Sequence, residues 1–263
     1  MYRYRPYRAD ELRLLLAAGQ VRFSDANFFN DPWDCRPLLR IPYLLDQREE
    51  DERWIGWLVG IKQRERDATA HSVEDYRAKL RTDRPLLHKE VATAGRVAIK
   101  RARDRYRLLC LSANGDIPLM WSHYASAHAG VCQIFDAKDE VIGQAEKVIY
   151  LPGYPAIDFP DDDNSDLLTA TFLTKARYWK YETEFRVIAK EGAANAESHF
   201  IPSHQGYVQI KPSALIGLIL GCQINPKHRE EAIAIARAAT NKVEIYQAHL
   251  DEESYQLKIL KSD

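Results

Sequence analysis

The sequence predicts an α+β fold: a single domain over residues 1–263, with a mixed, mostly antiparallel sheet, flanking helices and a helical insertion at about residues 49–107. Three observations favour this class. Short apolar or alternating segments, typical of strands, are too many for a simple β-α-β alternation. The insertion is rich in Glu, Arg, Lys and Ala and poor in β-branched runs. No internal repeat or low-complexity linker divides the chain.

The N-terminal elements follow from spacing and capping residues. Residues 1–5 are expected to form a strand, and Val21 and Phe23 alternate with polar neighbours in a second strand. Between them, Asp10 is a candidate N-cap and Gly19 a candidate C-terminal stop of a helix. The apolar stripe of this helix consists of Leu12, Leu15 and Leu16.

The helical insertion has an apolar pattern of its own. The residues at helical spacing in its first part are Trp54, Trp57, Leu58 and Ile61. The Asp-Arg-Pro sequence at residues 83–85 then breaks the chain before a second long helix. Leu87, Val91 and Ala98 are available for the buried side of that helix. We therefore expect a helical subdomain inserted between segments of one sheet.

The rest of the chain changes quickly between short elements. Strands are expected at residues 108–111, 131–135, 147–151, 182–189, 207–210, 215–220, 243–246 and 255–260. Helices are expected at residues 120–127, 165–178 and 226–240. Pro226 suits the first position of the last helix, and residues 158–166 are expected to form an acidic loop.

Composition limits the classes of function. The net charge is −1, from 37 Lys and Arg against 38 Asp and Glu, so the chain as a whole does not attract nucleic acid or anionic membranes. The four cysteines form no Cys-x-x-Cys pair, which favours free thiols in a reducing compartment. The charged N-terminus lacks an apolar core, and no apolar run approaches the roughly 20 residues of a membrane span. We therefore expect a cytoplasmic protein without a signal peptide.

The first of three polar segments is residues 29–35, Phe-Asn-Asp-Pro-Trp-Asp-Cys. Trp33 offers a stacking surface, whereas Asn30 and Asp31 offer oriented hydrogen bonds. This combination suits a planar ligand that carries a sugar. The alternative is an Asx-Pro turn held by Trp33 in the core.

The second segment is residues 119–130, LMWSHYASAHAG. On a short helix, Tyr124 and His128 share one face, and His123 and Tyr124 supply stacking surface and hydrogen-bond donors. One alternative is a structural role, with Trp121 in the core. A zinc site is a further alternative, but the two histidines lack the i, i+4 spacing of zinc-binding helices, and we expect no metal.

The third segment is residues 179–188, which contain Glu182, Glu184 and Arg186. On a strand these three side chains point the same way. Two carboxylates about 7 Å apart repel each other, which raises the proton affinity of at least one of them, and Arg186 partly offsets this. The trio is either a solvated strand face or a site that orients and polarises a substrate.

Together the three segments resemble a bacterial family, the domain of unknown function 2971. The signature of that family is an N-terminal Tyr-Lys/Arg-Tyr strand, then FNDPFD, then LMWSHYA-x-x-H-x-G, then W-x-YE-x-E-x-R. This sequence has MYRYR, FNDPWD, LMWSHYASAHAG and WKYETEFR in the same order. Trp33 replaces the usual Phe and remains aromatic. The resemblance covers most of the chain outside residues 49–107.

A second resemblance is to the ADP-ribosyltransferases, which bind NAD in a cleft of a split sheet. It implies an ADP-ribosyltransferase-like fold with such a split. Their three motifs are a basic residue or His on an early strand, an aromatic residue or Ser on a central one, and a Glu on a late one. Here the matching order is Arg3 or Arg5, then Tyr124 with His123, then Glu184.

The second resemblance also implies roles for these residues. Glu184 is expected to hold the ribose 2′-hydroxyl and to stabilise the positive charge that develops at the anomeric carbon, while Glu182 orients the acceptor. Tyr124 or Trp33 is expected to stack on nicotinamide. The residues expected to bind NAD, as a substrate, are Arg3, Arg5, Asn30, Asp31, Trp33, Trp121 and Arg186.

Three functions stay open at this stage. The first is an NAD-dependent ADP-ribosyltransferase or NAD glycohydrolase of bacterial defence or toxin systems, with a protein or a nucleic acid as acceptor. The second is a non-catalytic module of an antiviral system that senses a nucleotide or binds a partner. The third is a metal-dependent nuclease that uses Asp31, Asp34, Glu182 and Glu184. The basic run at residues 100–105 serves nucleic acid or is a solvated helix face.

Overall fold

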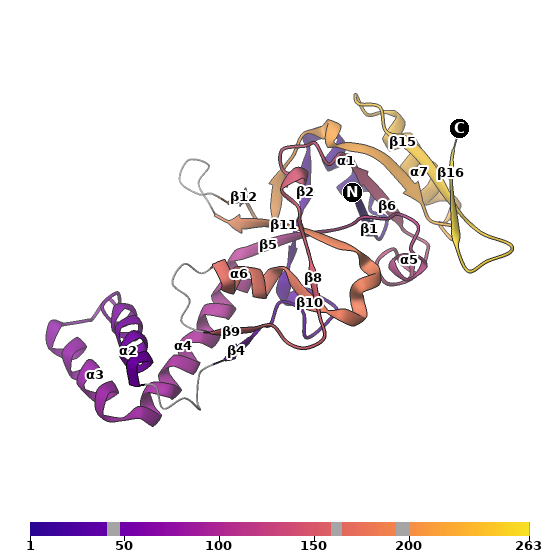
Figure 1. Cartoon of the computed structure of the whole chain (residues 1–263). Coiled ribbons are helices and arrows are strands. Elements are labelled where there is room, and N and C mark those ends of the chain that lie inside the picture. The colour runs from indigo at the N-terminus through magenta and orange to yellow at the C-terminus, as the bar shows by residue number, and fades with distance from the viewer. Residues whose placement is uncertain (41–47, 159–164, 193–199, 263) are drawn as a thin grey trace.

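The computed structural model describes residues 1–40, 48–158, 165–192 and 200–262, and its centre is a mixed sheet (Figure 1). Among these residues the sheet has ten strands, which include, in spatial order, β12 (Ile201–Ser203), β11 (Glu184–Glu191), β5 (Tyr106–Ser112), β1 (Tyr2–Arg5), β6 (Val131–Phe135), β14 (Leu215–Leu220), β15 (Glu244–Leu250) and β16 (Leu257–Lys261). Two short strands complete it, with β3 (Ser24–Asp25) on β5 and β7 (Glu146–Lys147) on β11. In the described part of this sheet only β11–β12 and β14–β15 are parallel pairs, so the predicted α+β class with a mostly antiparallel sheet is confirmed.

The sheet is nearly divided between β1 and β5. These strands are joined at a single residue pair, Tyr2 with Ser112. On either side the pairing is extensive: all of β1 pairs with β6, and β5 pairs with β11 from residue 106 to residue 112. The backbones of β1 and β5 therefore separate beyond Tyr2, which leaves room for side chains and a cavity between them.

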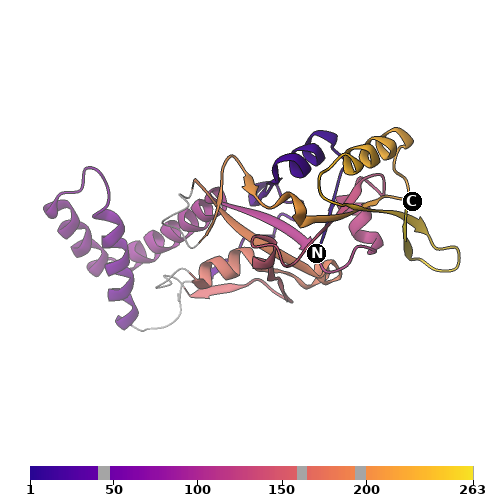
Figure 2. The same ribbon diagram turned by 90° about the horizontal axis from the view of Figure 1, so that it is seen from above.

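The alternation of side chains along the strands builds one core on each face of the sheet. On β14, Leu218 and Leu220 pack with α1 (Ala9–Ala18) and α7 (Pro226–Arg237), whereas Ile219 packs on the other face with Trp121 of α5 (Pro118–Tyr124). Helices α1 and α7 lie side by side over the first face (Figure 2). The sheet therefore has α1 and α7 on one face and α5 on the other.

The ends of α1 agree in part with the prediction. Gly19 has the left-handed conformation, φ +66°, and a Cβ there would lie 2.1 Å from the carbonyl oxygen of Ile210. Only glycine fits this close approach, so the predicted stop is confirmed. The predicted N-cap is wrong, because Arg8 occupies the cap position. Asp10 lies in the first turn instead, where a carboxylate still favours the helix dipole.

The insertion is helical as predicted and consists of α2 (Arg48–Lys62), α3 (Ala70–Thr82) and α4 (Arg84–Arg105). The side chain of Asp83 caps α4 by accepting a hydrogen bond from the backbone N–H of Leu86. The three helices bury a core of their own, made of Trp54, Ile55, Leu58, Val59, Val73, Leu80, Leu87 and Val91. Figures 1 and 2 show α2 and α3 held away from the sheet at the far end of α4.

The remaining elements of the described residues are short. They are β2 (Gln20–Arg22) paired with β13 (Tyr207–Gln209), β4 (Leu38–Arg40) with β9 (Ala156–Asp158), β8 (Ile149–Leu151) with β10 (Thr174–Ala176), the helix α6 (Ser165–Phe172), and the 3₁₀ turns η1 (Ala26–Phe28), η2 (Ile142–Gln144), η3 (Arg177–Glu182) and η4 (Pro212–Ala214). No helix among the described residues has the length and apolar character that a membrane crossing requires.

Several boundaries differ from the prediction, and three of these differences concern the candidate site. The helix expected at residues 165–178 ends at Phe172, because the next residues pair with β8 in the parallel strand β10. The strand expected from Glu182 begins at Glu184. Helix α5 ends at Tyr124, three residues earlier than expected. Most of the predicted acidic loop, residues 159–164, lies outside the described residues.

Candidate functional site

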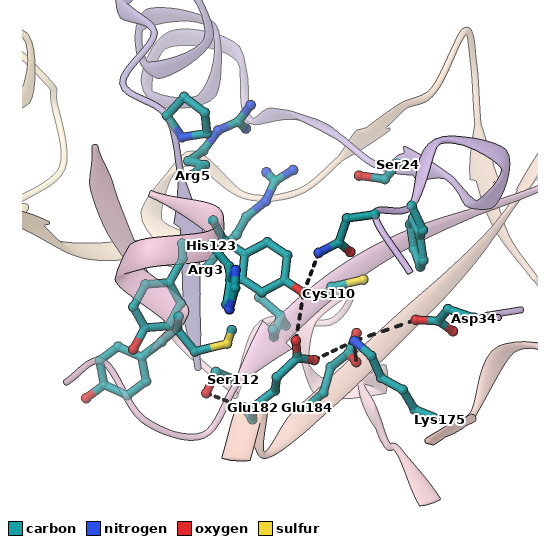
Figure 3. Close-up of a pocket in the computed structure, with 18 of the residues that line it drawn as sticks. Arg3, Arg5, Ser24, Asp34, Cys110, Ser112, His123, Lys175, Glu182 and Glu184 are labelled. Atoms are coloured by element: carbon teal, nitrogen blue, oxygen red, sulfur yellow. Dashed lines mark hydrogen bonds and ion pairs between the residues drawn. The ribbon is translucent and has the colours of Figure 1, made fainter. Parts of the chain in front are cut away.

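The three polar segments meet at a cavity of about 350 Å³ in the split between β1 and β5. Asn30 enters it from the first segment, Tyr124 from α5, and Glu182 and Glu184 from the junction of η3 and β11. Other lining residues are Arg3 and Arg5 of β1 and Cys110 and Ser112 of β5. Figure 3 shows the two arginines at one end of the cavity and Glu184 and Lys175 at the other.

Arg186 is fully buried behind the site and holds two of its carboxylates in position. The Arg186 guanidinium donates to both oxygens of Asp34, over 3.0 and 2.6 Å, and its Nε donates to Glu184 Oε1 over 2.7 Å. It also donates to the carbonyl oxygen of Phe172 over 2.9 Å. Arg186 therefore ties the first segment to β11 and lies behind the lining of the cavity, where it does not face a ligand.

Lys175 is the residue that the sequence interpretation missed. Its Nζ donates to Glu182 over 2.5 Å and to Glu184 over 3.1 Å, and lies 3.5 Å from Asp34. This side chain is 5% exposed, so the three carboxylates share a buried cation. Lys175 lies in the segment expected to be helical, and no sequence pattern around it indicates that it is buried among carboxylates. The parallel pairing of β10 with β8 is what turns Lys175 inward.

A left-handed residue explains how both glutamates reach Lys175. Thr183, between them, has φ +44°, which interrupts the strand alternation on which the prediction relied. Contacts with β5 and the residue after it hold this turn. The Ser112 hydroxyl donates to the carbonyl oxygen of Glu182 over 2.7 Å, and the N–H of Ala113 donates to the carbonyl oxygen of Thr183 over 3.1 Å. The two carboxylates are buried together, which excludes a solvated strand face.

A chain of hydrogen bonds joins all three segments. The Tyr124 hydroxyl donates to Glu182 Oε1 over 2.7 Å and accepts from the Asn30 amide over 3.4 Å. The other oxygen of Glu182 accepts from Lys175. Residues that are far apart in the sequence thus hold Glu182 in one position at the wall of the cavity.

The environments of the two glutamates separate their acidities. Burial raises the pKa of Glu182 to about 7, and Lys175 only partly offsets this. Burial also acts to raise the pKa of Glu184, but Arg186 and Lys175 outweigh it and lower that pKa to about 2. One carboxyl group therefore exchanges protons near neutral pH while its neighbour stays ionised, which is the arrangement of an acid–base site.

Lys175 remains charged in this setting. Burial acts to lower its pKa, but Glu184, Asp34 and Glu182 together raise it above the usual value. The pKa of Tyr124 is also raised, by burial, so its hydroxyl keeps its proton and donates to Glu182. The two groups that contact Glu182 are hence a permanent cation and a neutral donor.

Arg3, Arg5 and His123 line the cavity as the sequence interpretation expected. Arg3 Nη2 donates to the carbonyl oxygen of Arg22 over 2.6 Å, and Arg5 forms an ion pair with Glu11. His123 is exposed, and its ring centroid lies 6.0 Å from that of Trp179. Positive charge at one end and aromatic rings at the side suit a phosphate-bearing planar ligand.

Besides Arg186, three other residues expected to bind NAD do not line this cavity. Trp121 is fully buried, donates to the carbonyl oxygen of Gly115 over 3.0 Å and packs edge-on against Tyr4. It belongs to the core because its face of α5 is covered by the sheet. Asp31 accepts from the N–H of Trp33 in an Asx turn, and both residues line a second cavity next to the first.

Comparison with protein-family models, with curated proteins and with solved structures found no match to this chain. The resemblances to the domain of unknown function 2971 and to the ADP-ribosyltransferases therefore stay predictions from the motifs. Within the described parts of the chain, no group of three or more His, Cys, Asp or Glu side chains is placed to hold a metal ion. The shape and charge of the cavity are thus the main guide to function.

Proposed function

We propose that the protein is an NAD-dependent ADP-ribosyltransferase-like enzyme of bacterial defence or toxin systems. One observation carries this proposal: Arg3, Tyr124 and the pair Glu182–Glu184 line a single cavity at the split of the sheet. These residues belong to three distant segments, and their order along the chain is the order that the motif resemblance requires.

The size and lining of the cavity suit NAD as a substrate. Its volume of about 350 Å³ lies within the range of small-molecule sites. Arg3 supplies positive charge for the pyrophosphate, and Arg5, which is paired with Glu11, lies beside it. The rings of Phe29 and Tyr124 supply flat surfaces for a nicotinamide or adenine ring.

The charge pattern suits cleavage of a glycosidic bond. When the bond from ribose C1′ to nicotinamide breaks, nicotinamide leaves with the bonding electrons and positive charge develops on the ribose. The Glu184 carboxylate, ionised at any pH well above 2, stabilises that charge. The acceptor, or water, forms a new bond to C1′ and releases a proton. Glu182, with its pKa of about 7, is the group to accept this proton.

This division of roles refines the one drawn from the resemblance. Both oxygens of Glu184 already accept hydrogen bonds from Arg186, and one of them also accepts from Lys175. Such a carboxylate suits fixed electrostatic stabilisation. Glu182 is held more loosely, with one donor on each oxygen, and therefore suits proton transfer.

A second candidate is a non-catalytic module that binds a nucleotide in the same cavity. It is favoured by the full pairing of Asp34, Glu182 and Glu184 with Lys175 and Arg186, since such a cluster also serves a purely structural role. The same pairing disfavours the nuclease alternative, because a divalent ion needs carboxylate oxygens that no cation already occupies.

The test measures binding and turnover of NAD separately. Thermal shift and calorimetry report binding, and release of free nicotinamide reports turnover, with water or added acceptors. We expect Glu182→Gln to lower turnover at least about 100-fold while NAD still binds. The exposed Glu252→Gln serves as a matched control with wild-type turnover.

Each outcome has one meaning. Turnover that rises with pH through about 7 in the wild-type protein, and that Glu182→Gln abolishes, supports the enzyme. Binding with chemically unchanged NAD supports the sensing module. Absence of both binding and turnover overturns the assignment of NAD to this cavity.

A further inference from the structure

A second cavity of about 430 Å³ adjoins the first, and the proposed function does not use it. Asn30 and Lys175 line both cavities, so a molecule in the second cavity would lie next to the carboxylate cluster. Its position is that of a second substrate.

Four aromatic side chains contribute to the lining of this second cavity. They are Trp33, Tyr154, Tyr178 and Trp179. The first three are exposed by 63%, 51% and 85% of their surface, respectively, although large aromatic rings usually bury most of theirs. Rings that line a cavity and still expose their faces form a stacking platform for a planar ligand.

The charges around the second cavity favour an anionic ligand. Among the described lining residues, Arg36 is an exposed cation, Lys175 is a cation already paired with Asp34, Glu182 and Glu184, and Asp31 is the only carboxylate. Two more exposed cations, Arg177 and Lys180, flank the rings of η3. Phosphates that follow the rim would meet this positive charge.

Two polar residues of the lining suit the edge of a base. The Asn30 amide and the Asp31 carboxylate both line the cavity. Amide and carboxylate groups form hydrogen bonds with the ring edges of bases. The Asn30 amide also donates to Tyr124, and Asp31 also accepts from the N–H of Trp33, so these contacts fix both groups in position at the cavity.

We propose that the second cavity stacks an unpaired base of single-stranded nucleic acid. Its role as the acceptor of ADP-ribose rests on the proposed function, whereas the binding of the base does not. In the transfer step, a nitrogen of the base forms the bond to ribose C1′ as nicotinamide leaves with the bonding electrons. The proton of that nitrogen passes to Glu182.

The experiment is a fluorescence anisotropy titration of the full chain with short, labelled single-stranded oligonucleotides, each of one base type, without NAD. We expect Trp33→Ala and Tyr178→Ala each to weaken binding about ten-fold, because each removes a stacking ring. The matched control is Tyr255→Ala, which removes another fully exposed tyrosine, in the turn between β15 and β16, and leaves the affinity unchanged.

A second measurement reports the interaction with phosphates. Arg36→Gln is expected to make oligonucleotide binding less dependent on salt, because the variant neutralises about one phosphate fewer and so releases about one counterion fewer. Because Arg36 and Tyr178 are exposed, their variants are expected to fold even if Trp33→Ala does not.

The outcomes separate this inference from the proposed function. Oligonucleotide binding that depends on Tyr178 and Trp33 supports the second cavity even if NAD does not bind. Equal affinities of the Tyr178→Ala and Tyr255→Ala variants, or no oligonucleotide binding at all, overturn it even if NAD is consumed. Preferential binding of peptides rich in aromatic residues, abolished in Tyr178→Ala, also overturns it.

Discussion

Ion pairs in the helical insertion and at the candidate site have the same chemistry and opposite surroundings. In the insertion, Arg81 forms two hydrogen bonds with Glu52, and the side chains are 48% and 58% exposed. At the site, Arg186 forms two with Asp34, and the side chains are 0% and 1% exposed. Solvent screens the first pair, whereas burial shields the second from solvent.

This difference shows which interactions hold each region together. The insertion depends on its apolar core, and its exposed pairs contribute little. At the site, Asp34, Lys175, Glu182, Glu184 and Arg186 gave up their hydration on folding, and each depends on the others for compensation. Apolar residues at these positions would stabilise the fold equally well, so the presence of buried charges indicates a chemical role.

The largest expected effect comes from breaking the buried pair. Arg186→Met leaves Asp34 and Glu184 as buried charges without their main partner, and we expect it to lower the free energy of unfolding by about 3–5 kcal/mol. Urea denaturation measures this. The control is Arg81→Met in the insertion, for which no measurable change is expected. Equal decreases in the two variants would contradict the comparison.

The second prediction tests whether the core of the insertion is stabilised separately from the sheet. Leu87 is 1% exposed in the core of α2–α4, so Leu87→Ala is expected to cost about 3 kcal/mol. We expect hydrogen exchange to report faster opening of residues 48–105 with little change in the sheet. Leu109→Ala, in the buried strand β5, is expected to act on the sheet instead. Opening of β5 and β11 together with the insertion would show that the two regions form one cooperative unit.

A smaller effect concerns pH. The pKa of Glu182 is about 7 in the folded protein against its ordinary 4.5, so between these values the folded state binds more protons than the unfolded state. Stability therefore falls as pH rises from about 4.5 to about 7, by about 3 kcal/mol from this group. Urea titrations at several pH values are expected to show this fall, and to show it reduced in Glu182→Gln. An identical slope in the variant would place the raised pKa on another group.

Glu184 acts in the opposite sense. Its pKa of about 2 lies below the ordinary value, so its contribution is present above pH 4.5 and declines as pH falls toward 2. In the same titrations, the loss of stability as pH falls from about 4.5 toward 2 is therefore expected to be smaller in Arg186→Met, because this variant lacks the main cause of the lowered pKa of Glu184.

The smallest expected effect lies on the basic run of α4. Lys100 and Asp104 form an exposed pair at i, i+4, and Lys100→Ala is expected to leave the urea midpoint unchanged. It is also expected to leave oligonucleotide affinity unchanged, because Lys100 lies on α4 and does not line the second cavity. A large decrease in affinity would move the nucleic-acid interface from the second cavity to the insertion.

Sequence motifs alone indicate much of the candidate site. The three segments combine aromatic and polar groups beyond the needs of a loop, which is why the sequence marks Asn30, His123, Tyr124, Glu182 and Glu184 as candidates, and all five line one cavity. The same motifs predict Trp121 there too, wrongly, since periodicity alone does not tell which face of a short helix the sheet covers.

The amino-acid sequence by itself determined the α+β class, the helical insertion and the composition of the three segments, because periodicity, capping and residue type are local properties. Tertiary structure decided that Lys175 turns inward on β10, that Thr183 brings both glutamates to it, and that Trp33 lines a second cavity. These outcomes depend on contacts between residues far apart in the chain, and burial among opposite charges is what gave Glu182 and Glu184 different acidities.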